Sequence, residues 1–144
     1  MKKTLFYLWQ LPQHLLALAF WGLLKLCGWE SHRGSFLSQP VIVLKTRSFG
    51  LSLGEYIFVG LYEGRLGSGG FAGETVKHEH GHTIQSRRLG PLYLLLVGLP
   101  SISRNIWDRK FHRGWPPARR EAWYYGAWPE NQADRLGGVL RRYI

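Results

Sequence analysis

The sequence has only one cysteine, Cys27, in 144 residues. A single thiol cannot form a disulfide within the chain, so nothing in the sequence indicates an oxidising compartment. Zinc sites built from thiolates need two to four cysteines, so that kind of site is excluded as well. Any metal site in this chain must therefore use histidine and carboxylate side chains.

Acidic residues are also scarce, with 9 Asp and Glu against 19 Lys and Arg and a formal net charge of +10. This balance suits nucleic acid, an anionic membrane surface or an acidic partner, and does not choose among them. The chain lacks zinc-finger spacing, a long Lys/Arg run and the glycine-flanked stretch of RNA-recognition domains, so no nucleic-acid partner is expected. Its 45% hydrophobic and 15% aromatic content is typical of one folded domain.

No hydrophobic run is long and clean enough to predict a membrane span. Residues 5–24 have about the length of a span, roughly 20 residues. Four residues interrupt that run: Gln10, Pro12, Gln13 and His14. Two lysines precede it, as in a signal peptide, but no small-x-small cleavage site follows. Residues 1–30 are therefore predicted to form an apolar helix that is either membrane-associated or packed against a domain of residues 31–144.

The middle of the chain predicts short strands. The β-branched run at residues 41–44 and the stretch "EYIFVGLY" favour two or three strands in a small antiparallel sheet. The stretch "GRLGSGGFAG", residues 64–73, has five glycines in ten residues. It has neither the Lys-Ser/Thr of a P-loop nor a Gly-x-Gly-x-x-Gly that opens a helix, so it predicts only a loop.

The second half predicts mostly helix. Residues 74–88 are a helix candidate ended by Gly90-Pro91, and the apolar stretch that follows predicts a buried or membrane-dipping segment. The Arg-rich residues 104–120 predict a surface loop. The remaining residues predict helix, with Pro129 either kinking it or starting a new helix. This order of elements predicts an α+β fold with helices beside the sheet.

Residues 78–82, "HEHGH", match the pattern H-E-x-x-H. On a helix, His78 and His82 lie one turn apart on the same face and can direct ring nitrogens at one metal ion. Glu79 lies about 100° around the helix, where it can accept a proton from a metal-bound water. His80 falls on the far side and is expected to pack or to support the ligands. The alternative is an exposed His-rich helix turn, and a third ligand decides between the two.

Four acidic residues follow the motif, namely Asp108, Glu121, Glu130 and Asp134. Glu130 and Asp134 share a helix face, so one carboxylate could bind the metal while the other accepts the free N–H of a ligand histidine. Ala133 between them leaves room for close helix packing. The alternative for this pair is a solvated helix turn neutralised by Arg135. Gln85 and Arg88 stand where a metzincin would continue its motif, which excludes that subclass.

The pattern H-E-x-G-H, followed about fifty residues later by E-x-x-A-D, is similar to the gluzincin metallopeptidases. The closest likeness is to the membrane-bound kind that includes the CAAX prenyl proteases and the HtpX-like heat-shock proteases. The resemblance implies Zn²⁺ bound by His78, His82 and Glu130, with Glu79 as base and Asp134 supporting the ligands. It also implies that substrate binds along an edge strand, which "SLGEYIFVG" could supply. The stretches "LWQLPQHLL" and "HGHTIQSRRLGPLYLLLVGLPS" further resemble small bacterial proteins with zincin-like motifs.

The function that this resemblance implies is zinc-dependent hydrolysis of a peptide or protein substrate at a membrane surface. If neither apolar segment crosses the membrane, the site lies on the cytoplasmic face. Tyr124, Tyr125 and His112 are candidates, by residue type and position, for the oxyanion partner that such hydrolysis needs. Two alternatives remain. One is a non-catalytic zinc protein with a closed site, and the other is a basic membrane-surface protein in which the motif is incidental.

Overall fold

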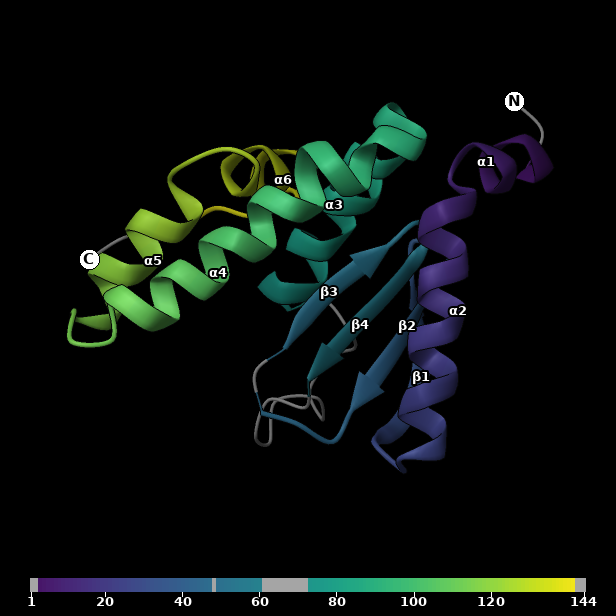
Figure 1. Cartoon of the computed structure of the whole chain (residues 1–144), viewed down its shortest axis with the longest axis horizontal. Coiled ribbons are helices and arrows are strands. Elements are labelled where there is room, and N and C mark those ends of the chain that lie inside the picture. The colour runs from purple at the N-terminus through teal and green to yellow at the C-terminus, as the bar shows by residue number, and fades with distance from the viewer. Residues whose placement is uncertain (1–2, 48, 61–72, 142–144) are drawn as a thin grey trace.

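A computed structural model describes residues 3–47, 49–60 and 73–141, which form an α+β fold, as predicted (Figure 1). The helices are α1 (Lys3–Trp9), α2 (Leu11–Leu26), α3 (Glu74–Leu89), α4 (Leu99–Phe111), α5 (Pro117–Tyr125) and α6 (Glu130–Gly137). A 3-10 turn (η1, Gly90–Leu92) and a π-helical turn (η2, Leu94–Gly98) join α3 to α4. The strands are β1 (Glu30–Phe36), β2 (Gln39–Leu44), β3 (Gly50–Leu53) and β4 (Tyr56–Gly60).

The four strands form one mixed sheet in the order β1-β2-β4-β3. β1 pairs with β2, and β3 with β4, in the predicted antiparallel sense. The central pair β2–β4 is parallel, so the prediction of a purely antiparallel sheet was wrong. Residues 41–44 are all buried, as is typical of a strand covered on both faces, and this apolar strand pairs with β4 at the centre of the sheet. β3 is left at an edge.

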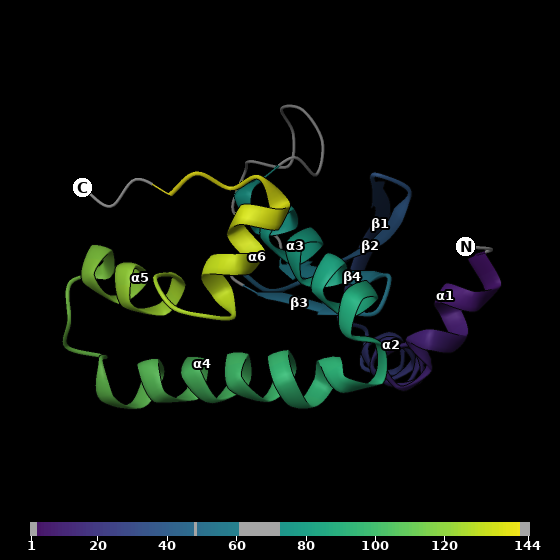
Figure 2. The same cartoon turned by 90° about the horizontal axis from the view of Figure 1, so that it is seen from above.

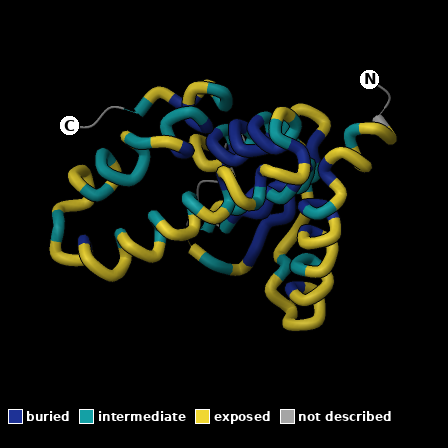
Figure 3. The backbone as a smooth tube through the Cα atoms, turned by 45° about the horizontal axis from the view of Figure 1, so that its top comes forward, coloured by how far each residue is buried: buried dark blue, intermediate teal, exposed yellow. Residues whose placement is uncertain are grey.

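Helices cover both faces of the sheet. On one face the core cluster joins α2 to the central strands through Ala17, Leu24, Ile42, Leu44 and Phe58. On the other face it joins α3 to alternate residues of the same strands through Val41, Val43, Ile57, Val59 and Val76. Figure 2 shows α2 and α4 on one side of the sheet and α3 and α6 on the other. Figure 3 shows that burial is concentrated in the sheet and α3, whereas α2 and α4 are largely exposed.

The polar residues that interrupt the N-terminal apolar run anchor it to α3. The Gln10 amide donates to Glu55 Oε1 at 3.0 Å and accepts from the Ser86 hydroxyl at 2.7 Å. Arg87 donates to both oxygens of Glu55, at 2.8 and 2.6 Å. Gln13 donates to the carbonyl of Gly90. If an apolar side chain replaced either glutamine, its partners would stay buried without these hydrogen bonds, which costs stability.

Because Glu55 accepts the hydrogen bonds of this anchor, we expect the stability of the fold to fall in acid. Burial raises the pKa of Glu55, but hydrogen bonds from Arg87 and Gln10 outweigh it and lower the pKa to about 2. A lowered folded-state pKa contributes stability above the unfolded value, about 4.3, that is lost as pH falls toward 2. We expect Glu55→Gln to lower the melting temperature by several degrees at pH 7 and to match the wild type near pH 2. Glu121→Gln, at an exposed position, is the control; equal acid dependence in all three proteins would contradict the assignment.

The N-terminal run forms two helices, with Pro12 in the first turn of α2, where its missing N–H costs least. The longest helices, α2 and α3, have 16 residues each. Within the described ranges, none of the helices combines the length and apolar character needed to cross a bilayer.

The prediction of a surface loop at residues 104–120 is wrong, because α4 continues to Phe111 and α5 begins at Pro117. Arg120 pairs with Asp108 across the short connection, through hydrogen bonds of 3.1 Å and 2.5 Å to Oδ2. α6 begins directly after Pro129, which therefore precedes a new helix instead of kinking a long one. The predicted glycine-rich loop lies outside the described residues except for Gly73.

Candidate metal centre

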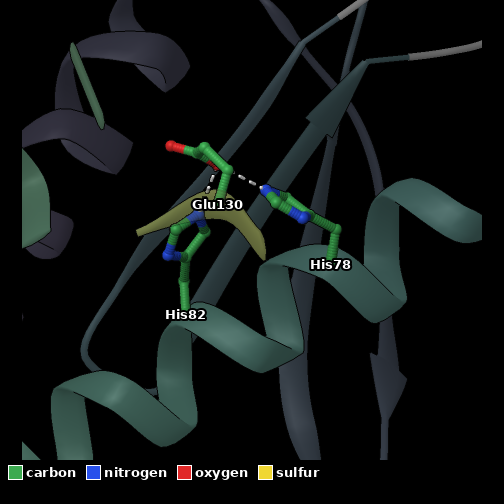
Figure 4. Close-up of side chains that lie close together, drawn as sticks. All are labelled: His78, His82 and Glu130. Carbon is green, nitrogen blue, oxygen red and sulfur yellow. Dashed lines mark hydrogen bonds and ion pairs between the residues drawn. The ribbon is translucent and has the colours of Figure 1, made fainter. Parts of the chain in front are cut away.

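The H-E-x-x-H residues lie in the middle of α3, on the part of the helix that contacts α6. His78 and His82 are both buried. Their ring centroids are 4.7 Å apart and their planes are nearly perpendicular, at 88°. Figure 4 shows both rings directed at Glu130, the first residue of α6. The structure therefore brings together the three residues predicted as ligands.

The ligand atoms converge on a small volume. Glu130 Oε2 lies 2.9 Å from His78 Nε2 and 3.2 Å from His82 Nε2. One ligand atom from each residue lies within 4.8 Å of the others. In a tetrahedral zinc site with bonds of about 2.0–2.1 Å, ligand atoms are about 3.3 Å apart. This buried cluster could therefore bind a metal ion with only small adjustments of the side chains.

Asp134 supports His78, in the position expected from the E-x-x-A-D spacing. Its Oδ1 accepts from His78 Nδ1 at 2.7 Å. Arg141 holds the same carboxylate through hydrogen bonds of 2.6 and 3.1 Å. With Nδ1 engaged, the ring orientation is fixed and Nε2 faces Glu130, which is how a carboxylate orients a metal-binding histidine.

Gln85 supports His82 in the same way, and its role was missed in the sequence. Its Oε1 accepts from His82 Nδ1 at 2.7 Å, while its amide donates to the carbonyl of Pro129 at 3.1 Å. The side chain thus fixes one ligand ring and ties it to the residue before Glu130. Its position three residues after His82 on the same helix was the available signal.

The α3–α6 contact is close enough to require glycine. A Cβ on Gly81 would lie 1.9 Å from the carbonyl oxygen of Ala133, and a Cβ on Gly137 would lie 1.9 Å from that of Lys77. Ala133 is fully buried, so the close packing expected there is confirmed. The near contact of the two backbones lets the short Glu130 side chain reach both histidines.

Charges in the cluster favour the ligand form of Glu130. Burial lowers the pKa of His78, but hydrogen bonds to Asp134 and Glu130 raise it to about 9. Burial raises the pKa of Glu130, and the two histidines outweigh this and hold it well below its ordinary value. The carboxyl group is therefore ionised at neutral pH. A metal ion at His78 Nε2 would replace the proton there.

Glu79 lies beside the cluster and faces two cavities. It is buried, and a Cβ on Gly50 of the edge strand β3 would be 2.4 Å from its Oε1. A cavity of about 460 Å³ is lined by His78 and Glu79, and a second of about 230 Å³ by Glu79 and His82. Burial raises the pKa of Glu79. Glu79 is thus a buried carboxyl group beside both histidines, at the meeting point of the two cavities.

The three oxyanion candidates lie in different places. The Tyr124 hydroxyl donates to Glu130 Oε1 at 3.3 Å. The Tyr125 ring meets His78 edge-on, with centroids 5.2 Å apart, and lines the larger cavity. Burial raises the pKa of both phenols, that of Tyr125 to about 12, so both keep their protons. His112 is not brought to the cluster.

His112 and His80 are engaged elsewhere. His112 Nδ1 lies 3.3 Å from Asp108 Oδ1, and its ring stacks on Trp115 at the α4–α5 connection. His80, on the far side of α3, donates from Nδ1 to Gln39 Oε1 at 2.6 Å and meets the ring of Phe36 edge-on. His80 therefore packs against the sheet, as expected from its place on the helix.

The chain matches no protein-family model, no curated protein and no solved structure. The likeness to gluzincins therefore depends on the two motifs, and the functional argument depends on the geometry of the site.

Proposed function

We propose that the protein is a zinc-dependent metallopeptidase of the gluzincin type. In this proposal His78, His82 and Glu130 bind the ion, and Glu79 is the base. One observation carries the proposal: Glu130 converges on both motif histidines from another helix, while Glu79 faces two cavities, of about 460 and 230 Å³. The buried donor set of two imidazoles and one carboxylate is one that zinc accepts, with a fourth position left for water.

The residues around the cluster have the roles that peptide hydrolysis needs. Zinc held by His78, His82 and Glu130 would supply a water whose pKa is lowered toward 7. Glu79 would accept the proton of the attacking water and pass it to the leaving amine. Asp134 and Gln85 hold the ligand rings in orientation. Tyr125, still protonated and next to His78, is available to donate a hydrogen bond to the developing oxyanion, whereas the Tyr124 hydroxyl is engaged with Glu130.

The edge strand beside Glu79 supports a peptide as the substrate. β3 is hydrogen-bonded to β4 on one side only within the described sheet. Residues of β3 line both cavities. An extended peptide could therefore add to this edge through backbone hydrogen bonds, with its side chains in the cavities.

Removal of the metal tests the proposal. Untagged, zinc-loaded protein is expected to cleave quenched fluorescent peptides, and chelation by 1,10-phenanthroline should reduce cleavage to the uncatalysed rate. Zinc added back should restore it. Mg²⁺ or Ca²⁺ should not, because both prefer all-oxygen sites. Hydrolysis that survives complete metal removal would overturn the zinc mechanism, and a zinc-loaded protein inactive on every peptide would overturn the peptidase.

We further propose that the protein lies on the cytoplasmic surface of a membrane, with the exposed side of α2 and α4 toward the lipid. These helices lie on the same side of the sheet (Figure 2). They carry large exposed apolar residues that line neither cavity: Leu15, Leu18, Leu23, Ile106, Trp107 and Phe111. Lys25, Lys110 and Arg113 lie on or next to the same helices. An apolar surface with basic residues around it suits anionic lipid.

Sedimentation with vesicles tests this orientation. The protein should bind vesicles that contain phosphatidylserine or phosphatidylglycerol more tightly than neutral ones. The variant Ile106→Glu, at an exposed isoleucine of α4 that lines neither cavity, should lose most of the binding. The control is Leu37→Glu, which places the same charge at an exposed leucine of the β1–β2 turn. If both variants bind as the wild type does, α4 does not face the lipid.

A further inference from the structure

The two cavities that meet at Glu79 differ in chemistry. Three arginines contribute to the larger one, of about 460 Å³: Arg47, Arg109 and Arg141. The smaller one, of about 230 Å³, is lined mainly by apolar side chains, among them Leu51, Leu53, Leu94, Leu99 and Ile102. Glu79 lines both. A peptide bond placed at Glu79 therefore has a cationic cavity on one side and an apolar cavity on the other.

We propose that the site selects peptides with a carboxylate group on one side of the scissile bond and an apolar side chain on the other. The carboxylate would occupy the cavity of the three arginines, and the apolar side chain would occupy the smaller cavity. This inference rests on the proposed peptidase function and names its substrate class.

The arginines are placed to bind an anion. Arg109 makes no ion pair with any residue of the described chain, because the neighbouring Asp108 pairs with Arg120. Arg141 is fixed by its two hydrogen bonds to Asp134 and by the ring of Tyr125, whose centroid is 3.3 Å from the guanidinium carbon. One arginine is thus available for pairing and another is held rigidly at the same cavity. Guanidinium groups bind carboxylates through paired, charge-assisted hydrogen bonds.

One face of α4 contributes polar side chains to the larger cavity. Ser101, Asn105 and Arg109 are spaced four residues apart, lie on one helix face and all line the larger cavity. Among the described residues that line it, Glu79 is the only acidic one. The cavity is therefore positive, a field that attracts anionic groups and repels basic ones. A neutral side chain there would shield Arg109 from water without pairing it, which disfavours binding.

The carboxylate can come from an Asp or Glu side chain or from a free C-terminus, and the experiment distinguishes these sources. The probes are fluorescent heptapeptides with central Leu-Asp or Asp-Leu, their Asn counterparts, and each of these as C-terminal acid or amide. Binding to zinc-loaded Glu79→Gln protein is measured by anisotropy, so that turnover does not interfere. At least one Asp peptide, or one free acid, is expected to bind about tenfold more tightly than its neutral counterpart.

A matched pair of variants locates the effect. Arg109→Gln, in the Glu79→Gln background, should abolish most of the preference for the carboxylate. Lys110→Gln removes the same charge from the next residue of α4, which lines neither cavity, and should keep the preference. Equal binding of acidic and neutral peptides, or equal effects of the two variants, would overturn this inference and leave the peptidase proposal standing. If none of the peptides binds and the wild type cleaves none, both fail.

Discussion

Replacing Glu79 with glutamine is expected to abolish peptide hydrolysis while zinc stays bound. The amide has nearly the shape of the carboxylate and fits the same space beside Gly50, whose backbone approaches the side chain closely. It cannot take a proton from the attacking water, however. Loss of a general base costs typically 10²–10⁴-fold in rate, so we expect a fall of about 10³-fold in kcat/KM. Zinc content should equal that of the wild type, because Glu79 is not a ligand.

Glu74→Gln is the matched control for this variant, since it makes the same change in the exposed first turn of α3. It should leave both activity and zinc unchanged. Activity of Glu79→Gln within a few-fold of the wild type would show that another group is the base. If neither protein hydrolyses any peptide and both hold one zinc, the alternative of a non-catalytic zinc site would be favoured instead.

Replacing Gly81 with alanine is expected to damage the metal centre from a distance. The new methyl group would stand 1.9 Å from the carbonyl oxygen of Ala133. Both are backbone-bound, so the clash can be relieved only if α6 moves away from α3. Glu130 would then move out of reach of the two histidines. Overpacking in a core typically costs about 1–3 kcal/mol, and zinc affinity should fall by at least about 100-fold, as for a displaced ligand.

Gly22→Ala is the control, because a Cβ there meets no atom within 4 Å. In the interior of α2 this change should leave stability unchanged or raise it by up to about 1 kcal/mol. Thermal unfolding followed by circular dichroism, together with zinc titration, measures both effects. A Gly81→Ala protein with the melting temperature and zinc affinity of the wild type would contradict the close α3–α6 contact.

The residues of the cluster are predictable within each helix because their spacing there is local, whereas the contact between α3 and α6 joins residues about fifty positions apart. Residues four apart on a helix share a face, so the H-E-x-x-H pattern by itself predicts that His78 and His82 point the same way. The E-x-x-A-D spacing identifies Glu130 and Asp134 by the same reasoning, and both carboxylates lie at His78. The α3 boundary near Gly90 follows from a glycine and a proline that end a helix.

Other features depend on contacts that a sequence pattern does not contain. In the sheet, β4 lies between β2 and β3 and pairs with β2 in parallel. The sequence does not indicate this order, because strand propensity is the same for parallel and antiparallel pairs. The arginines of residues 104–120 favour a loop by composition, but Arg120 pairs with Asp108 across the α4–α5 connection. His112 has the chemistry of an oxyanion partner, but it lies at the end of α4, where it contacts Asp108 and stacks on Trp115.

Metal content of untagged protein, measured by mass spectrometry, tests the central claim most directly. We expect one zinc per chain in the wild type, loss of zinc in Glu130→Ala, and one zinc in Asp108→Ala, which removes an acidic residue paired with Arg120 away from the cluster. Wild-type protein without zinc, or Glu130→Ala protein that keeps it at full occupancy, would contradict the three-ligand centre and the enzyme proposed from it.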